Sequence, residues 1–261
     1  MITSSSNDRV KLVRKLQNQR GVRHREQRFV LEGVRLVEEA VRASLVPAFV
    51  LYTEALADEA RGKALLATLH GLKAPCYVVS ESVMAACSDT VTPQGILAVL
   101  SFPDLTPPEP LTFALIGDRL RDPGNLGTLL RTALAAGVEQ VLLAPGTVDF
   151  TNPKVVRSAM GAHMRLPIVD ADWDTIADRV SGCDVWLAAV RGGMLHTDVD
   201  WTRPTALILG GEARGAGERA SALAEGSVSI PIPQAVESLN AAVAAAVILF
   251  EVVRQRRLHR P

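Results

Sequence analysis

The apolar positions of the chain form short runs that alternate with amphipathic stretches of helical length. Before residue 101, the runs Pro47–Tyr52, Cys76–Val79 and Ile96–Leu100 predict buried strands, and Gly33–Ala43 and Glu54–Leu69 predict helices. After residue 111, strands are predicted at Phe113–Ile116, Val141–Ala144, Val185–Val190, Ala206–Leu209 and Val228–Ile232. Helices are predicted there at Leu126–Ala136, Trp173–Val180 and Leu239–Arg257. Because strands separated by helices need crossover connections, we expect an α/β fold in both parts, with a mainly parallel sheet in the second.

A proline-rich segment divides the chain. Residues 101–111 read SFPDLTPPEPL and contain four prolines. Proline cannot continue a helix or donate to a central strand, so this segment predicts a linker. We therefore expect a first domain at residues 1–100 and a second at residues 112–261, each long enough to fold around its own core.

The composition is that of a folded protein. Of the 261 residues, 48% are hydrophobic and 21% are charged, which excludes a mainly disordered chain. The longest apolar run, Ala241–Phe250, has ten residues, whereas a membrane-spanning helix needs about 20. The three cysteines form no CxxC motif and the five histidines form no HExxH motif. We expect a cytoplasmic protein with no membrane partner and no structural metal.

Charge is distributed unevenly, although 28 basic residues balance 28 acidic ones. Residues 1–28 carry a net charge of +6, and the other 233 residues carry −6. The basic residues of this N-terminal segment are Arg9, Lys11, Arg14, Lys15, Arg20, Arg23, Arg25 and Arg28. A second basic cluster lies near the C-terminus at Arg254, Arg256, Arg257 and Arg260. We interpret the N-terminal segment as a basic arm. Such a segment is typical of phosphate binding or of a solvated helix face, and composition leaves both open.

Three segments place a strand directly before a loop with polar or glycine residues. In the first, GDRLRDPGNLGTLLRTA at residues 117–133, the pair Asp122-Pro123 begins a helix that carries Asn125 and Arg131. The second is LILGGEARGAG at residues 207–217, and the third, residues 229–255, has Ser238 and Asn240 before an alanine-rich helix. Alone, each segment fits a helix cap or a tight turn. Because carboxyl ends of parallel strands meet at one edge of a sheet, the three together predict a ligand site.

Taken in order, these segments resemble the motifs of SPOUT-class RNA ribose 2′-O-methyltransferases of the SpoU/TrmH type. The matching stretches read DPGNLGTLLRTA, GGEARG and IPIP…SLNAA. The N-terminal stretch is similar to the substrate-binding domain of many members, at Asn7, Lys11, Arg23, Phe29, Glu32, Gly33, Glu39 and Ala40. The resemblance implies a trefoil-knotted α/β domain that binds S-adenosylmethionine in the knot. It also implies a homodimer through that C-terminal domain, and a small ribosomal-protein-like domain that binds RNA.

The resemblance also assigns site residues. At the reaction centre it implies Asn125, Arg131, Glu212, Ser238 and Asn240. For cofactor binding it implies Leu209, Gly210, Gly211, Glu212, Ile230, Pro231, Ser238 and Leu239. Together with the charge pattern, it predicts RNA binding by Arg9, Lys11, Arg14, Lys15, Arg23, Arg25 and Arg28. Members commonly have asparagine where this chain has Gly211, so a side-chain contact that braces the loop or the substrate is in doubt here.

The implied activity is transfer of a methyl group from S-adenosylmethionine to a ribose 2′-hydroxyl of structured RNA. By the same resemblance, a separate RNA-binding domain before the knotted domain favours ribosomal RNA over tRNA. Since the guanidinium of arginine is a very weak acid and keeps its proton, we expect Arg131 to stabilise negative charge instead of acting as a base. One alternative is an inactive RNA-binding protein of the same fold. Another, a dinucleotide-dependent oxidoreductase, is disfavoured because no GxGxxG follows the first strand of either domain.

Overall fold

The computed structural model describes residues 1–211 and 215–259, and the chain divides into two compact units. Unit 1 comprises Met1–Asp104 and Thr151–Met164, and unit 2 comprises Leu105–Phe150 and Arg165–Pro261. The chain therefore passes from one unit to the other inside the proline-rich segment. The sequence-based division kept all of residues 112–261 together, whereas the structure groups Thr151–Met164 with unit 1.

Unit 1 is a four-stranded sheet with helices. Its strands are β1 (Arg28–Glu32), β2 (Phe49–Tyr52), β3 (Cys76–Val78) and β4 (Ile96–Ser101). They lie in the order β1-β4-β2-β3, in which only the β2–β3 pair is parallel. Its helices are α1 (Asp8–Asn18), α2 (Arg20–Glu26), α3 (Val34–Arg42), α4 (Glu54–Asp58), α5 (Ala60–Gly71), α6 (Glu81–Cys87), α8 (Pro153–Ala159) and the 3₁₀ turn η1 (Ala162–Met164).

The basic N-terminal segment folds as helices α1 and α2, not as an extended arm. Val10, Val13 and Leu16 of α1 are fully buried in one of the two hydrophobic clusters of unit 1. Arg23 is only 4% exposed, and its Nη1 donates to the carbonyls of Leu16 and Gln17 at 2.7 and 3.3 Å. Because these carbonyls lie in the last turn of α1, Arg23 caps that helix. Burial and these two bonds give Arg23 a structural role in unit 1, which distinguishes it from the exposed basic residues of the segment.

Helix α8 joins unit 1 through both apolar and charged contacts. Val156 and Met164 belong to the hydrophobic cluster that contains Phe29 of β1. The Arg157 guanidinium lies 2.8 Å from the Asp89 carboxylate and 3.9 Å from the buried carboxylate of Glu32. These contacts attach a segment from the second half of the sequence to the N-terminal sheet.

Unit 2 is a seven-stranded, all-parallel sheet with helices on both faces. Its strands are β5 (Phe113–Asp118), β6 (Gln140–Leu143), β7 (Ile168–Asp170), β8 (Asp184–Ala188), β9 (Met194–Leu195), β10 (Thr205–Gly210) and β11 (Gly226–Ser229). They lie in the order β7-β6-β5-β10-β8-β11-β9. Its helices are α7 (Pro123–Ala136), α9 (Trp173–Arg179), α10 (Glu218–Leu223) and α11 (Ala241–Leu258).

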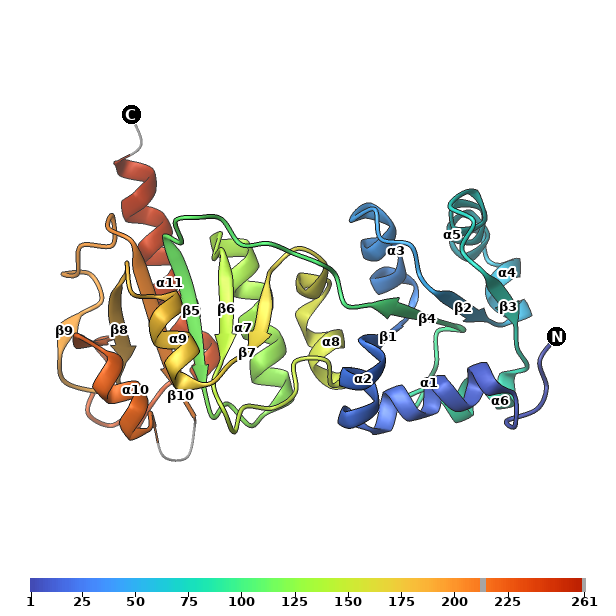
Figure 1. The fold of residues 1–261 in the computed structure, drawn as a ribbon, viewed down its shortest axis with the longest axis horizontal. Coiled ribbons are helices and arrows are strands. Elements are labelled where there is room, and N and C mark those ends of the chain that lie inside the picture. Colours follow the sequence, from blue (N-terminus) through green and yellow to red (C-terminus); the bar gives the residue numbers. More distant parts are fainter. Residues whose placement is uncertain (212–214, 260–261) are drawn as a thin grey trace. The chain divides into compact units, whose positions relative to one another are not determined.

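The layers of unit 2 position its loops. Helices α7 and α11 pack against each other on one face of the sheet, and α9 and α10 cover the other (Figure 1). The predicted α/β class with a mainly parallel sheet is confirmed. Strand β5 lies between β6 and β10, so the chain changes direction across the sheet at this point, where open α/β folds bind ligands. The trefoil knot implied by the resemblance stays a prediction.

Several predicted boundaries differ from the observed ones for local reasons. The strand predicted at Val228–Ile232 ends at Ser229, because Pro231 and Pro233 cannot donate ladder hydrogen bonds. The single helix predicted at Glu54–Leu69 is two helices that meet at Glu59. Gly62 permits this corner, since a Cβ there would lie 2.1 Å from the Leu56 carbonyl oxygen.

Candidate functional site

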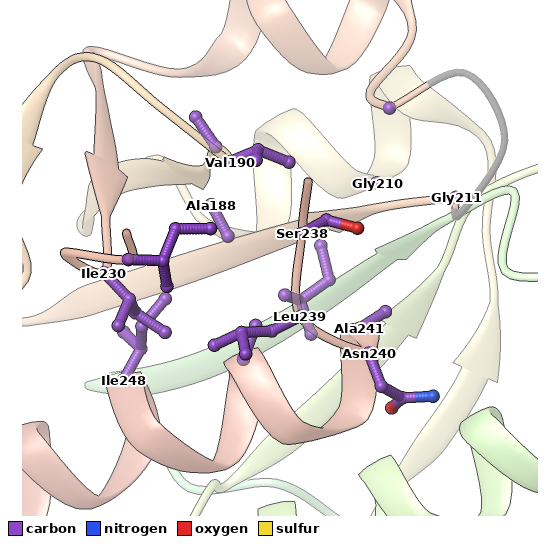
Figure 2. A pocket seen from close by; sticks show the side chains of 15 residues that line it. Ala188, Val190, Gly210, Gly211, Ile230, Ser238, Leu239, Asn240, Ala241 and Ile248 are labelled. Carbon is purple, nitrogen blue, oxygen red and sulfur yellow. The ribbon is translucent and has the colours of Figure 1, made fainter. Parts of the chain in front are cut away.

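A cavity of about 320 Å³ opens at the carboxyl end of β10 in unit 2 (Figure 2). Four segments line it: residues 188–190 at the end of β8, residues 209–211 and 215 around the loop after β10, residues 230, 232, 238 and 239 before α11, and residues 240, 241, 244 and 248 at the start of α11. Most of these side chains are apolar or absent. The cavity is thus a mainly apolar slot with polar groups at one end.

Local sequence explains the shape of this cavity. Ala241, Ala244 and Ile248 recur at helical spacing, so one face of α11 forms its floor. Gly210 forms part of the opposite wall, where an added Cβ would lie 2.4 Å from the backbone nitrogen of Ala216. Only glycine at position 210 allows the backbone of Ala216 to approach this closely.

Most of the predicted cofactor residues line the cavity: Leu209, Gly210, Gly211, Ile230, Ser238 and Leu239. Within the described residues, Pro231 is not part of the lining. Glu212 lies outside the residues that the structure describes. Sequence reasoning missed Ala188, Ala189 and Val190, because only the strand order of the folded sheet brings the end of β8 beside β10.

The first and third sequence motifs meet at a pair of asparagines. Asn240 caps α11, with its Oδ1 accepting from the backbone nitrogens of Ala242 and Val243 at 2.9 and 3.3 Å. Its Nδ2 donates to Oδ1 of Asn125 at 2.9 Å. The backbone nitrogen of Asn125 in turn donates to Oδ1 of Asp122, the N-cap of α7, at 2.7 Å. Two helix N-termini, which favour negative charge, therefore meet beside the cavity.

Arg131 and Ser238 occupy different surroundings. Ser238 is exposed at the mouth of the cavity (Figure 2). Arg131 is exposed on α7 and is not part of the lining formed by the described residues. The structure therefore brings together Asn125, Ser238 and Asn240, while the Arg131 side chain stands outside the cavity.

Arg191 is a residue of this region that sequence reasoning missed. It follows Val190, which lines the cavity, and its Nη2 donates to the carbonyls of Gln234 and Val236 at 3.2 and 3.0 Å. These contacts tie the segment after β8 to the loop that carries Ser238 and Leu239. No signal in the sequence indicates these hydrogen bonds, since Gln234 and Val236 lie 43 and 45 residues after Arg191.

The predicted RNA-binding residues other than Arg23 lie at the surface of unit 1. Arg9, Lys11, Arg14, Lys15 and Arg25 are exposed, and Arg28 is half-buried. The Arg9 guanidinium lies 4.0 Å from the centre of the Tyr77 ring. Among the described residues, no cluster of His, Cys, Asp or Glu could hold a metal ion, and no helix could cross a membrane.

The cavity lies at the ends of parallel strands, between a glycine-rich loop and a helix N-terminus, and this arrangement is typical of nucleotide-type cofactor sites. Comparisons with known proteins identify the class as S-adenosylmethionine-dependent RNA methyltransferases. Residues 112–250 match the SpoU rRNA methylase family, and residues 7–98 match the MRM3-like substrate binding domain. The chain belongs to the SpoU rRNA methylase family. It is an S-adenosylmethionine-dependent RNA 2′-O-methyltransferase, which confirms the resemblance seen in its motifs.

Individual relatives match over both units. The 23S rRNA (guanosine(2553)-2′-O)-methyltransferase RlmP of Bacillus subtilis is 36% identical over 258 residues, covering 96% of this chain and 98% of the relative. The human mitochondrial rRNA methyltransferase 3 is 32% identical, covering 91% of this chain and 70% of the relative. The crystal structure of the SpoU methyltransferase AviRb from Streptomyces viridochromogenes, in complex with AdoMet, superposes with a TM-score of 0.87 at 29% identity. It covers 97% of this chain and 100% of AviRb.

The cavity fits S-adenosylmethionine. Leu209, Ile230 and Leu239 provide apolar side chains for a planar adenine ring. The glycines at 210 and 211 leave backbone groups accessible to the polar parts of the cofactor, and a Cβ at Gly210 would not fit. These residues would hold the cofactor, and Ser238 and Asn240 add polar groups to the same lining.

Proposed function

We propose that the protein methylates a ribose 2′-hydroxyl of ribosomal RNA. The observation that carries this proposal is the match along both units, substrate-binding domain included, to a 23S rRNA methyltransferase. Relatives named as rRNA methyltransferases match this chain along both units at 30–36% identity, which favours ribosomal RNA over tRNA. A ribosomal substrate is also compatible with the predicted cytoplasmic location.

The proposed mechanism assigns different tasks to the polar residues. When bound, S-adenosylmethionine supplies an activated methyl group. Asn125, oriented by Asn240, donates a hydrogen bond that positions the target ribose or its phosphate. Arg131 stabilises the negative charge that develops on the 2′-oxygen as the hydroxyl proton leaves to water. Glu212, the predicted acid of the second motif, keeps its proposed place at the reaction centre by resemblance alone.

RNA binding is proposed for the exposed basic residues of α1 and α2. Lys11 and Lys15 lie one helical turn apart on α1, so they present two positive charges on one face. Arg9, Arg14, Arg25 and Arg28 extend this positive surface. Regularly spaced cations on a helix suit the phosphates of a structured RNA.

We also propose a homodimer formed through unit 2. Val243, Val247 and Phe250 recur every three or four residues along α11, and all three are exposed. An apolar stripe on an amphipathic helix is typical of a protein–protein interface. Because α7 packs along α11, association through this stripe would also bring Arg131 to the edge of the interface. The dimer would then complete the reaction centre.

A methylation assay tests the proposed function. Purified protein and labelled S-adenosylmethionine are incubated with 23S rRNA transcripts, ribosomal subunits or tRNA, and labelled ribose positions are mapped. We expect label on one 2′-oxygen of ribosomal RNA. Label on tRNA alone would overturn the ribosomal assignment. Cofactor binding without transfer to any of these RNAs would favour an inactive RNA-binding protein.

A further inference from the structure

The carboxyl end of β5 contains a pair of charged residues, Asp118 and Arg119, that the site described above does not use. Asp118 is only 2% exposed. Arg119 has a φ of 55°, in the left-handed region that residues other than glycine rarely adopt. A buried acid next to a strained arginine at a sheet edge needs a structural or functional reason.

Arg119 lies in a slot lined by glycines. A Cβ added to Gly211 would lie 2.5 Å from the Arg119 carbonyl oxygen, and one added to Gly217 would lie 2.9 Å from Nη2. On the far side, a Cβ at Gly146 would lie 3.1 Å from Cγ of Arg119. The Nη2 group itself donates to the carbonyl of Gly215 at 3.3 Å. Gly211 and Gly217 therefore lie closer to Arg119 than a residue with a side chain could.

Asp118 forms a hydrogen bond with Gly217, which follows β10. Its Oδ2 accepts a hydrogen bond from the backbone nitrogen of Gly217 at 2.6 Å, and its Oδ1 lies 3.4 Å from Nε of Arg119. A buried carboxylate that accepts from a backbone N–H makes one of the stronger hydrogen bonds in proteins. The loop is thus attached to the end of β5 at Gly211 by packing, at Gly215 by its carbonyl and at Gly217 by its N–H.

These attachments bear directly on the cofactor cavity, because Gly210, Gly211 and Gly215 form one of its walls. We propose that Asp118 and Arg119 are positioning residues that hold this wall in place and so set the affinity for S-adenosylmethionine. This inference rests on the proposed function for the identity of the ligand. The close approach also accounts for Gly211, because the Cβ of an asparagine there would lie 2.5 Å from the backbone carbonyl oxygen of Arg119.

Calorimetric titration with S-adenosylmethionine tests the proposal without relying on turnover. We expect Arg119→Ala to raise the dissociation constant by about tenfold, the usual effect of losing one charged hydrogen bond. Arg119→Gly should have the same effect, and glycine adopts a φ of 55° without strain, so this variant keeps the fold. The matched control is Arg121→Ala, which removes an exposed arginine from the same loop and should leave affinity unchanged.

Amide hydrogen exchange provides a second readout. In Asp118→Asn, the amide of Gly217 should exchange about tenfold faster than in the wild type, because its acceptor loses its charge. Unchanged affinity in both Arg119 variants, or unchanged Gly217 exchange in Asp118→Asn, would overturn the proposal. If the wild-type protein bound no S-adenosylmethionine, the proposed function would fall. The exchange rate of the Gly217 amide would still show whether Asp118 holds Gly217 in place.

Discussion

Asn240 donates a hydrogen bond from Nδ2 to Oδ1 of Asn125 at 2.9 Å, which joins the N-terminus of α11 to that of α7. The orientation of both amides follows from this contact. Oδ1 of Asn240 faces two backbone N–H groups, which can only donate, so its Nδ2 must face Asn125. Oδ1 of Asn125 accepts from that group. The Nδ2 of Asn125, which can only donate, therefore faces groups other than Asn240.

Asn240→Asp separates the two roles of this residue. Aspartate caps α11 as well as asparagine does, so we expect an unchanged melting temperature. It cannot donate to Asn125, which would rotate its amide to offer Nδ2 to the new carboxylate. Turnover should fall on the order of 10²-fold, as when a positioned donor is lost from other active sites. Thermal melts and initial rates, measured side by side, check both statements.

Asn240→Ala is the matched variant for this prediction. It removes the cap together with the contact to Asn125, so it should lose about 1 kcal/mol of stability as well as activity. Near-normal turnover in Asn240→Asp would show that the orientation of Asn125 does not matter for the reaction.

The Arg131→Lys variant tests whether the reaction centre needs the planar, charged guanidinium group of Arg131. Arg131→Lys keeps the charge but loses the paired donors of the guanidinium, and we expect turnover to fall by about 10²–10³-fold with little change in cofactor affinity. Rates at saturating RNA and calorimetry with S-adenosylmethionine check this. Arg121→Lys, at another exposed arginine of unit 2, serves as the control. An Arg131→Lys enzyme with near-normal turnover would contradict the proposed role.

Features with a local cause could be predicted from the sequence. Asp122-Pro123 predicts the start of α7, because capping depends on residues within one turn. For α11 the sequence left Ser238 and Asn240 open as caps, and the structure has Asn240. The alternation of apolar runs likewise predicted the parallel sheet. Since parallel strands end at one edge, the meeting of Asn125 with Asn240 follows from the fold class.

Features that join distant segments could not be predicted. Arg119 bonds to a residue 96 positions away, and Asp118 to one 99 positions away. The sequence alone also does not separate the eight basic residues of residues 1–28 by role, because only the folded structure distinguishes buried Arg23 from exposed Lys15. Helix α8 lies far along the chain from the strands of unit 1, and no pattern near Arg157 indicates Asp89 as its partner.

The cysteines should be unreactive while the protein is folded. Burial raises the pKa of the Cys87 thiol to about 11, and it also raises the pKa of the Cys76 and Cys183 thiols. A raised folded-state pKa favours the protonated thiol, and this contribution to stability is lost only as pH rises toward 11. We expect a disulfide reagent at pH 8 to label the three thiols after denaturation but not before. Rapid labelling of Cys87 in the native protein would contradict this.

The salt dependence of RNA binding tests the role of α1. Deleting residues 1–28 would remove Val10, Val13 and Leu16 from the core, so substitution is the better test. For Lys11→Gln/Lys15→Gln we expect the slope of log K against log salt to become shallower by about 1.5 if both lysines contact phosphates. Filter binding across a salt series measures this slope.

Lys63→Gln/Lys73→Gln is the matched control for that experiment. It removes the same charge from exposed positions of unit 1 outside α1 and α2, and it should leave the slope nearly unchanged. An equal change of slope in both double variants would indicate general attraction to the unit instead of contacts made by α1.

Glutamate substitutions at two equally exposed valines test the proposed dimer. Val247 on α11 and Val169 on β7 are each 39% exposed, but only Val247 belongs to the apolar stripe. We expect the wild type and Val169→Glu to have twice the chain mass of 27.9 kDa by light scattering, and Val247→Glu to be a monomer. A buried, unpaired carboxylate at the interface costs more than the stripe can offset. If association also completes the reaction centre, Val247→Glu loses methyl transfer while it still binds S-adenosylmethionine. A dimeric Val247→Glu would contradict the proposed interface, and an active monomer would contradict its role in completing the reaction centre.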